Sequence, residues 1–190
     1  MNRRRAIWGI ALLGGSSLVA GASAWLVWHK KPDLAYLARQ KPLLAALAET
    51  ILPATDTPGA IDAGVPDFLL KMLLENTTPA AQNRFMAGLA SVEGYCRDSY
   101  GRSYVQCSPE QQHVVMRRIE ADGQPRGGMV GKVERKLMGE SFFSLLKSYT
   151  CLGYYTSMLG ATRGVAYSAV PGRYVGCRTM TVGQKAWATK

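Results

Sequence analysis

Acidic and histidine side chains are scarce in this chain, and the common motifs of catalysis are missing. The 190 residues include 13 aspartates and glutamates against 23 lysines and arginines, and two histidines. The sequence has no G-x-G-x-x-G, no P-loop, no G-x-S-x-G and no H-E-x-x-H motif. The sequence therefore gives no sign of a nucleotide-binding enzyme, an α/β-hydrolase or a zinc protease. Its apolar content of 47% still predicts one ordinary globular domain.

The formal charge of +10 does not by itself indicate nucleic-acid binding. The basic residues are spread along the chain, are densest at Lys30–Lys31, Arg117–Arg118 and Arg135–Lys136, and are not interleaved with aromatics in a recognisable module. We expect no nucleic acid among the partners, and an acidic protein or an anionic lipid surface fits the charge instead.

The N-terminus has the features of an export signal. Arg4 and Arg5 precede an uncharged and mildly apolar run, Ala6–Trp28, as in the twin-arginine signal. Ala22 and Ala24 form an A-x-A cleavage candidate, but the run is also long enough to be a membrane anchor. Residues 1–28 are thus expected to be a signal or a signal anchor, which places the rest on the periplasmic side of the inner membrane.

Helical periodicity dominates the remainder and predicts an all-α domain. We expect a linker over 29–41 and one domain over 42–190, made of about five helices and an irregular C-terminal arm from Gly160. Ser108, followed by proline and by Gln111, has the pattern of a capping box. The expected helices cover 42–52, 65–77, 79–92, 109–121 and 132–159, the last with a break near Cys151.

A few side chains could carry chemistry, but each has a structural interpretation that we favour. Asp56 and Asp62 could be an acid/base pair, yet they stand in a proline- and glycine-rich turn that uses such residues. His113 could belong to a triad, yet no carboxylate at a motif spacing would orient it. An aromatic ligand face could use the tyrosines, although core or interface packing explains them as well: Tyr154, Tyr155, Tyr167 and Tyr174.

The four cysteines are even in number, which in an oxidising compartment first indicates disulfides. Pairing Cys96 with Cys107, and Cys151 with Cys177, closes the shortest loops, but all three pairings and a bond to a partner chain stay open. A zinc site of Cys96, Cys107 and His113 has poor ligand spacing.

Two segments resemble the gluconate 2-dehydrogenase subunit 3 family, the small subunit of a membrane-associated dehydrogenase. Leu43–Leu69 reads LLAALAETILPATDTPGAIDAGVPDFL, with leucine at 52 where the family usually has isoleucine. Tyr154–Cys177 reads YYTSMLGATRGVAYSAVPGRYVGC, with arginine at 163 where glutamine is common. We call these two stretches the first and the second signature segment.

The resemblance implies a subunit without catalytic, cofactor or metal residues of its own. It would accompany an FAD-containing large subunit of the glucose-methanol-choline type, with a haem c cytochrome subunit in some complexes. The small subunit would supply the signal with which the folded complex crosses the inner membrane through the twin-arginine machinery. Candidate contacts with the large subunit lie in the two signature segments: Pro53, Asp56, Thr57, Pro58, Gly59, Pro171, Gly172, Arg173 and Tyr174.

Two other functions remain open from the residues alone. One is an independent thiol oxidoreductase that uses Cys96 and Cys107. The other is a membrane-anchored periplasmic scaffold without a flavoprotein partner. The sugar or polyol oxidised cannot be inferred, because its specificity would belong to another chain.

Overall fold

The expected all-α class is confirmed. The structure, a computed structural model, describes residues 30–124, 139–170, 172–173, 176–177 and 179–188, and over these ranges every regular element is a helix. None of the helices described is both long and apolar enough to cross a membrane. The signal or anchor expected over 1–28, with Arg4, Arg5, Ala22 and Ala24, lies outside the described residues.

The first three helices lie close together. Helix α2 (Leu34–Arg39) begins at Asp33, whose carboxylate accepts the Tyr36 N–H at 2.8 Å. It occupies the interval expected to be a linker, and Leu37 within it is fully buried against α3 and α4. Helices α3 (Lys41–Ile51) and α4 (Val65–Glu75) each have proline in the first turn, where its missing N–H costs nothing.

Helix α5 (Pro79–Tyr100) is longer than the sequence predicts. It continues past Val92 through Gly94 and ends where Gly101 adopts a left-handed φ of 67°. A short 3-10 turn, η1 (Tyr104–Gln106), leads into α6 (Pro109–Gly123). The expected capping box is present, with Ser108 and Gln111 each accepting the other's backbone N–H through a side-chain oxygen.

Helix α8 (Phe142–Thr156) begins at Ser141, whose hydroxyl accepts the Ser144 N–H. The helix does not break near Cys151 as expected, because Gly153 is not a weak point there but the place where the Phe68 ring packs. The break comes at Ser157, which is extended, and a short π-helix, η2 (Gly160–Gly164), follows. The beginning expected near residue 132 lies outside the described residues.

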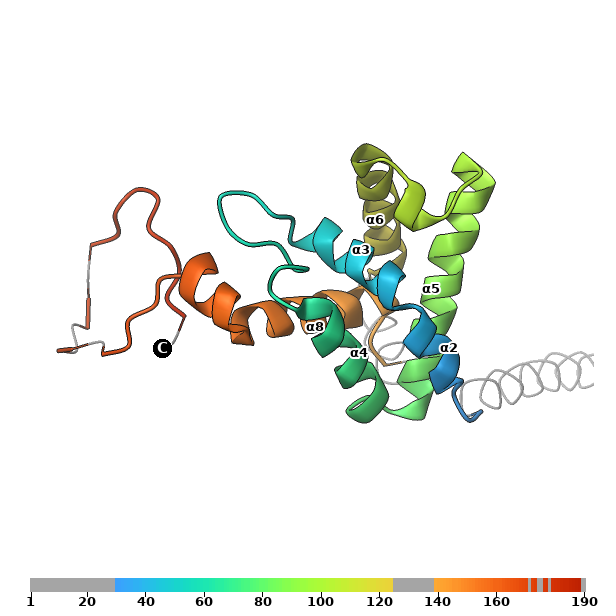
Figure 1. The fold of residues 1–190 in the computed structure, drawn as a ribbon, viewed down its shortest axis with the longest axis horizontal. Coiled ribbons are helices and arrows are strands. Elements are labelled where there is room, and N and C mark those ends of the chain that lie inside the picture. The colour runs from blue at the N-terminus through green and yellow to red at the C-terminus, as the bar shows by residue number, and fades with distance from the viewer. Residues whose placement is uncertain (1–29, 125–138, 171, 174–175, 178, 189–190) are drawn as a thin grey trace, which may run out of the picture.

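The helices enclose one apolar core to which each of α2 to α6 and α8 contributes. Helix α8 packs on α4 and also contacts α3, α5 and α6. Figure 1 shows the far end of α8, the loop between α3 and α4, and the C-terminal arm on the side away from α5 and α6. The largest fully buried side chains are Leu37, Leu44, Leu47, Val65, Leu69, Leu73, Phe85, Leu89, Val92, Tyr104, Val115 and Leu146.

Candidate functional site: the surface shared by the two signature segments

The loop between α3 and α4, residues 52–64, is held in shape by one carboxylate. Glu49, in the last turn of α3, accepts the Ala54 N–H at 2.9 Å through Oε1 and the Ile61 N–H at 2.8 Å through Oε2. A single side chain thus ties together both sides of the loop. The only sequence signal for this role is an acid at the C-terminal end of a helix, where the dipole disfavours it unless it has partners.

Gly59 lies inside this loop, and its missing side chain makes the turn fit. A Cβ at this position would collide with Glu49 Oε1 and lie 2.8 Å from the Ala54 nitrogen. The Gly59 N–H donates to Asp62 Oδ2 at 3.2 Å, which closes the turn from the other side. Glycine is therefore the residue that the fold of this loop requires.

The two acids considered for catalysis both form hydrogen bonds within the loop. Asp56 is exposed, and its Oδ1 accepts the Thr55 hydroxyl at 3.0 Å. Asp62, also exposed, accepts the Gly59 N–H. The structure thus supports the interpretation of Asp62 as a turn-forming group, while the bond of Asp56 is to a neighbouring side chain.

The second signature segment lies directly against this loop, although about a hundred residues separate them. The Tyr154 hydroxyl, at the end of α8, donates to the Pro58 carbonyl at 2.9 Å. Gly153 lets the Phe68 ring of α4 lie against the α8 backbone, since a Cβ there would come within 2.6 Å of the ring. Residues of both segments line one open hollow of about 470 Å³: Ala54, Thr55, Asp56, Thr57, Pro58, Asp62, Leu159 and Arg163.

The π-helix η2 depends on glycine at both of its ends. A Cβ on Gly160 would collide with the Tyr154 carbonyl oxygen, and one on Gly164 would lie 2.7 Å from the Tyr154 hydroxyl. The Ser157 hydroxyl donates to the Tyr154 carbonyl at 2.7 Å and accepts the Gly160 N–H at 2.9 Å, and so bridges the break. The G-A-T-R-G motif is therefore a set of close backbone approaches around Tyr154.

Several apolar side chains on the outside of this region are exposed in the part of the chain that the structure describes. On α8, Leu152 is 46% exposed and Tyr155 is 51% exposed, and Met158 just beyond the helix is 77% exposed. The arm beyond η2 is tied down by few contacts, among them a backbone bridge from Ala166 to Trp187 and a bond from Lys185 Nζ to the Arg163 carbonyl at 2.7 Å. Further exposed apolar residues lie on the arm: Tyr167, Val170, Met180, Val182 and Trp187.

The remaining candidate contacts differ in accessibility. Pro53 is exposed and Thr57 is half-buried, while Gly172, with a φ of 71°, and Arg173 are exposed on the arm. Pro171 and Tyr174 lie outside the described residues.

The tyrosines do not form one ligand face. Tyr154 is 5% exposed and turns its hydroxyl to Pro58, whereas its neighbour Tyr155 faces outward with a ring at nearly a right angle to that of Tyr154. Tyr167 is exposed on the arm. His113 is exposed on α6.

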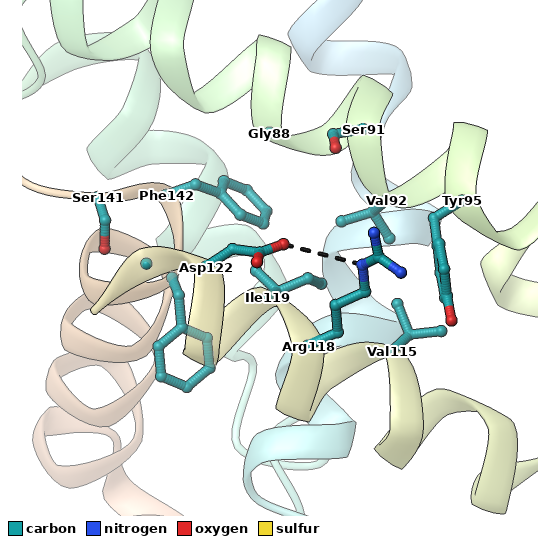
Figure 2. A pocket seen from close by; sticks show the side chains of 12 residues that line it. Gly88, Ser91, Val92, Tyr95, Val115, Arg118, Ile119, Asp122, Ser141 and Phe142 are labelled. Carbon is teal, nitrogen blue, oxygen red and sulfur yellow. Dashed lines mark ion pairs between the residues drawn. The ribbon is translucent and has the colours of Figure 1, made fainter. Parts of the chain in front are cut away.

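A second hollow, which sequence reasoning missed, lies between α5, α6 and the start of α8. It measures about 210 Å³, and Figure 2 shows Arg118 at one side of it between Asp122 and Tyr95. Arg118 Nε lies 3.8 Å from Asp122 Oδ2, and the guanidinium is 4.3 Å from the centre of the Tyr95 ring. Both interactions keep the guanidinium occupied, and no cysteine or histidine lines the hollow. It offers no nucleophile with an adjacent base.

All four cysteines are described, and all four are free thiols in this structure. Cys96 and Cys107 are buried, Cys151 is half-buried on α8 and Cys177 is exposed on the arm. The expected disulfides are thus not formed here, although Cys107 is a near neighbour of Cys96 and raises the pKa of its thiol. Within the described ranges, no histidines, cysteines and carboxylates gather in a group that could hold a metal ion.

Comparison with known proteins gives one result. A family model described as gluconate 2-dehydrogenase subunit 3 matches residues 38–172. That interval begins in α2 and ends on the arm, so it contains the whole first signature segment and most of the second. No curated protein and no solved structure matches the chain.

Proposed function

Because the chain belongs to the gluconate 2-dehydrogenase subunit 3 family, we propose that it is the non-catalytic small subunit of a periplasmic, membrane-associated, FAD-dependent dehydrogenase of sugars or polyols. Its role is to bind the folded flavoprotein subunit and to bring it across the inner membrane by the twin-arginine route. The leader with Arg4 and Arg5 supports the export part of the proposal.

The convergence of the two signature segments is the observation that carries this proposal. Glu49 and Tyr154 fix the loop between α3 and α4 against the end of α8, and the exposed apolar side chains of α8 and the arm lie beside this fixed region. A rigid, shaped surface next to uncovered tyrosine, methionine and tryptophan is typical of a protein interface. We therefore assign this surface to the large subunit.

The cofactors are placed in the partners. The sequence has no dinucleotide fingerprint, and no residue of this chain is assigned to FAD or to haem c. In the proposed complex the large subunit oxidises the substrate with its flavin, and a cytochrome c subunit takes up the electrons. The small subunit contributes binding, orientation and export.

The geometry favours this function over an independent thiol oxidoreductase. A reactive cysteine is partly exposed and has a lowered pKa. Burial, and then the neighbouring Cys107, raise the pKa of the Cys96 thiol to about 12. The Cys96 thiol is therefore a poor nucleophile in the folded chain.

The proposal is tested by co-expression of the full chain with the flavoprotein encoded beside it, followed by affinity purification from the membrane and periplasmic fractions. We expect the flavin absorbance to co-purify with the small subunit. Leu152→Glu places a charge on the outer face of α8 and should lower the recovered flavin at least tenfold, since a buried unpaired charge costs more than about 1.4 kcal/mol.

Val114→Glu is the matched control, because Val114 is 50% exposed on α6. Helix α6 as a whole lies away from the loop between α3 and α4 and from the arm (Figure 1). It should leave flavin recovery unchanged. If the small subunit purifies alone, and its deletion leaves the dehydrogenase exported and active, the proposed function is wrong. Equal losses for the two variants would refute the assignment of the surface while leaving the function standing.

A further inference from the structure

Two buried thiols meet at the corner between α5 and α6. Cys96 lies one turn before the end of α5 and is completely buried, and Cys107 follows η1 directly and is 7% exposed. Cys107 is a close enough neighbour of Cys96 to raise the pKa of the Cys96 thiol. The Cys107 thiol also donates to the Ser103 carbonyl at 3.4 Å.

The corner that brings the thiols together is held by other contacts. The left-handed Gly101 reverses the chain after α5. Glu93 of α5 then accepts both the Ser103 hydroxyl and the Tyr104 N–H at 3.1 Å each, so a carboxylate from α5 fixes the segment that carries Cys107. The Tyr104 ring is fully buried, and its hydroxyl donates to Thr50 Oγ1 at 2.9 Å. The proximity of the two thiols is thus built into the fold.

We propose that Cys96 and Cys107 are a redox-convertible pair, which forms an intramolecular disulfide when the folded chain meets a disulfide oxidant. The bond would join the end of α5 to the start of α6 across an eleven-residue separation in sequence. The periplasm in which we place the protein contains such oxidants, so the physiological setting, though not the chemistry, rests on the proposed function.

The reaction is two thiol–disulfide exchanges. The Cys107 thiolate, from the more accessible thiol, attacks one sulfur of the oxidant's disulfide, and the oxidant's other sulfur leaves as a thiol after taking up a proton. The Cys96 thiolate then attacks Sγ of Cys107 and releases the second oxidant thiol. Two protein thiols become one disulfide, and one oxidant disulfide becomes two thiols. Burial of Cys96, which raises its pKa, predicts that the second step is slow.

The pairing can be read from tryptic peptides of the full-length chain. Cleavage after Arg97 and Arg102 places Cys96 in peptide 85–97 and Cys107 in peptide 103–117, while Cys151 and Cys177 fall in 148–163 and 174–178. Purified reduced protein is incubated with oxidised glutathione for a day, with and without a sub-denaturing concentration of urea that speeds opening of the corner. Free thiols are then blocked by N-ethylmaleimide before digestion.

We expect loss of the alkylated forms of peptides 85–97 and 103–117 and their appearance as one linked species. Cys151→Ser should leave this linked species unchanged, whereas Cys96→Ser should convert Cys107 to its glutathione adduct. If both thiols remain alkylated, or form only separate glutathione adducts, with and without urea, the proposal is overturned. The location is tested separately by analysing the same peptides from periplasmic and cytoplasmic fractions. If the disulfide forms in vitro but both cysteines are free thiols in every cell fraction, export is contradicted and the redox-convertible pair is not.

Discussion

The hydrogen bond between the Tyr154 hydroxyl and the Pro58 carbonyl joins the two signature segments directly. Removing it is the most direct test of how much this contact stabilises the packing of one segment on the other. Tyr154→Phe removes one oxygen and leaves the ring in place. The hydroxyl is nearly buried and donates at 2.9 Å, whereas Pro58 is half-buried, so water can reach the vacated carbonyl in part. We therefore expect the free energy of unfolding to decrease by about 1 kcal/mol, which is in the lower part of the range for losing a buried hydrogen bond.

The adjacent residue provides the control. Tyr155 is 51% exposed, so Tyr155→Phe removes a hydroxyl that water already solvates and should change the free energy of unfolding by less than about 0.5 kcal/mol. Urea unfolding of both variants, analysed with a common slope, measures the difference.

Limited proteolysis can distinguish opening of the loop between α3 and α4 from unfolding of the whole domain. A protease that cuts before aspartate attacks Asp56 and Asp62 when the loop opens. If the Tyr154 bond closes the loop, Tyr154→Phe should speed this cleavage about fivefold, the equivalent of 1 kcal/mol, and Tyr155→Phe should not. Equal stability and equal cleavage in the two variants would refute the idea that this hydroxyl fastens the loop to α8.

Three further outcomes are expected. Gly59→Ala should destabilise the fold by about 1–3 kcal/mol, because the new Cβ meets the Ala54 nitrogen and the Glu49 carboxylate, and thermal unfolding of the purified chain would show it. Gly94→Ala should instead raise the free energy of unfolding by roughly 0.5–1 kcal/mol, since Gly94 is inside α5 with nothing within 4 Å of a new Cβ; a lower melting temperature would contradict this. With all cysteines reduced, the stability should decline as the pH rises from about 9 towards 12. The raised pKa of Cys96 keeps its proton in the folded chain while the unfolded chain loses it, so Cys96→Ala should flatten urea midpoints measured over that range.

The sequence predicted helix boundaries correctly where the residues that cap the helix are its immediate neighbours in the chain. The predictions from the Ser108 capping box and from the prolines of α3 and α4 were correct, because these groups act within one helical turn. The end of α5 and the break in α8 were placed wrongly. Gly94 and Gly153 look like weak points in a sequence, but Gly94 lies in a long continuous helix and Gly153 is packed by Phe68.

The sequence predicted that the segment between α3 and α4 is a turn, but it did not predict the long-range hydrogen bonds that hold this loop in place. Proline and glycine indicate a turn at residues 53–59, and the structure confirms the interpretation of Asp62 as a turn-forming group, whereas Asp56 accepts the hydroxyl of its neighbour Thr55. Glu49 reaches N–H groups five and twelve residues ahead, and Tyr154 reaches a carbonyl 96 residues back. No periodicity or local motif encodes pairs at such separations.

The sequence by itself determined the helical class, the family resemblance and the two segments that carry this resemblance, because periodicity, caps and motifs act over a few residues. Only the tertiary structure decided that these two segments form one surface, that the glycines of η2 make room around Tyr154, and that Cys96 and Cys107 are buried as neighbours at one corner. These are relations between side chains that meet only after α4, α5 and α8 have packed. They depend on the shape of the whole core rather than on any short stretch of the chain.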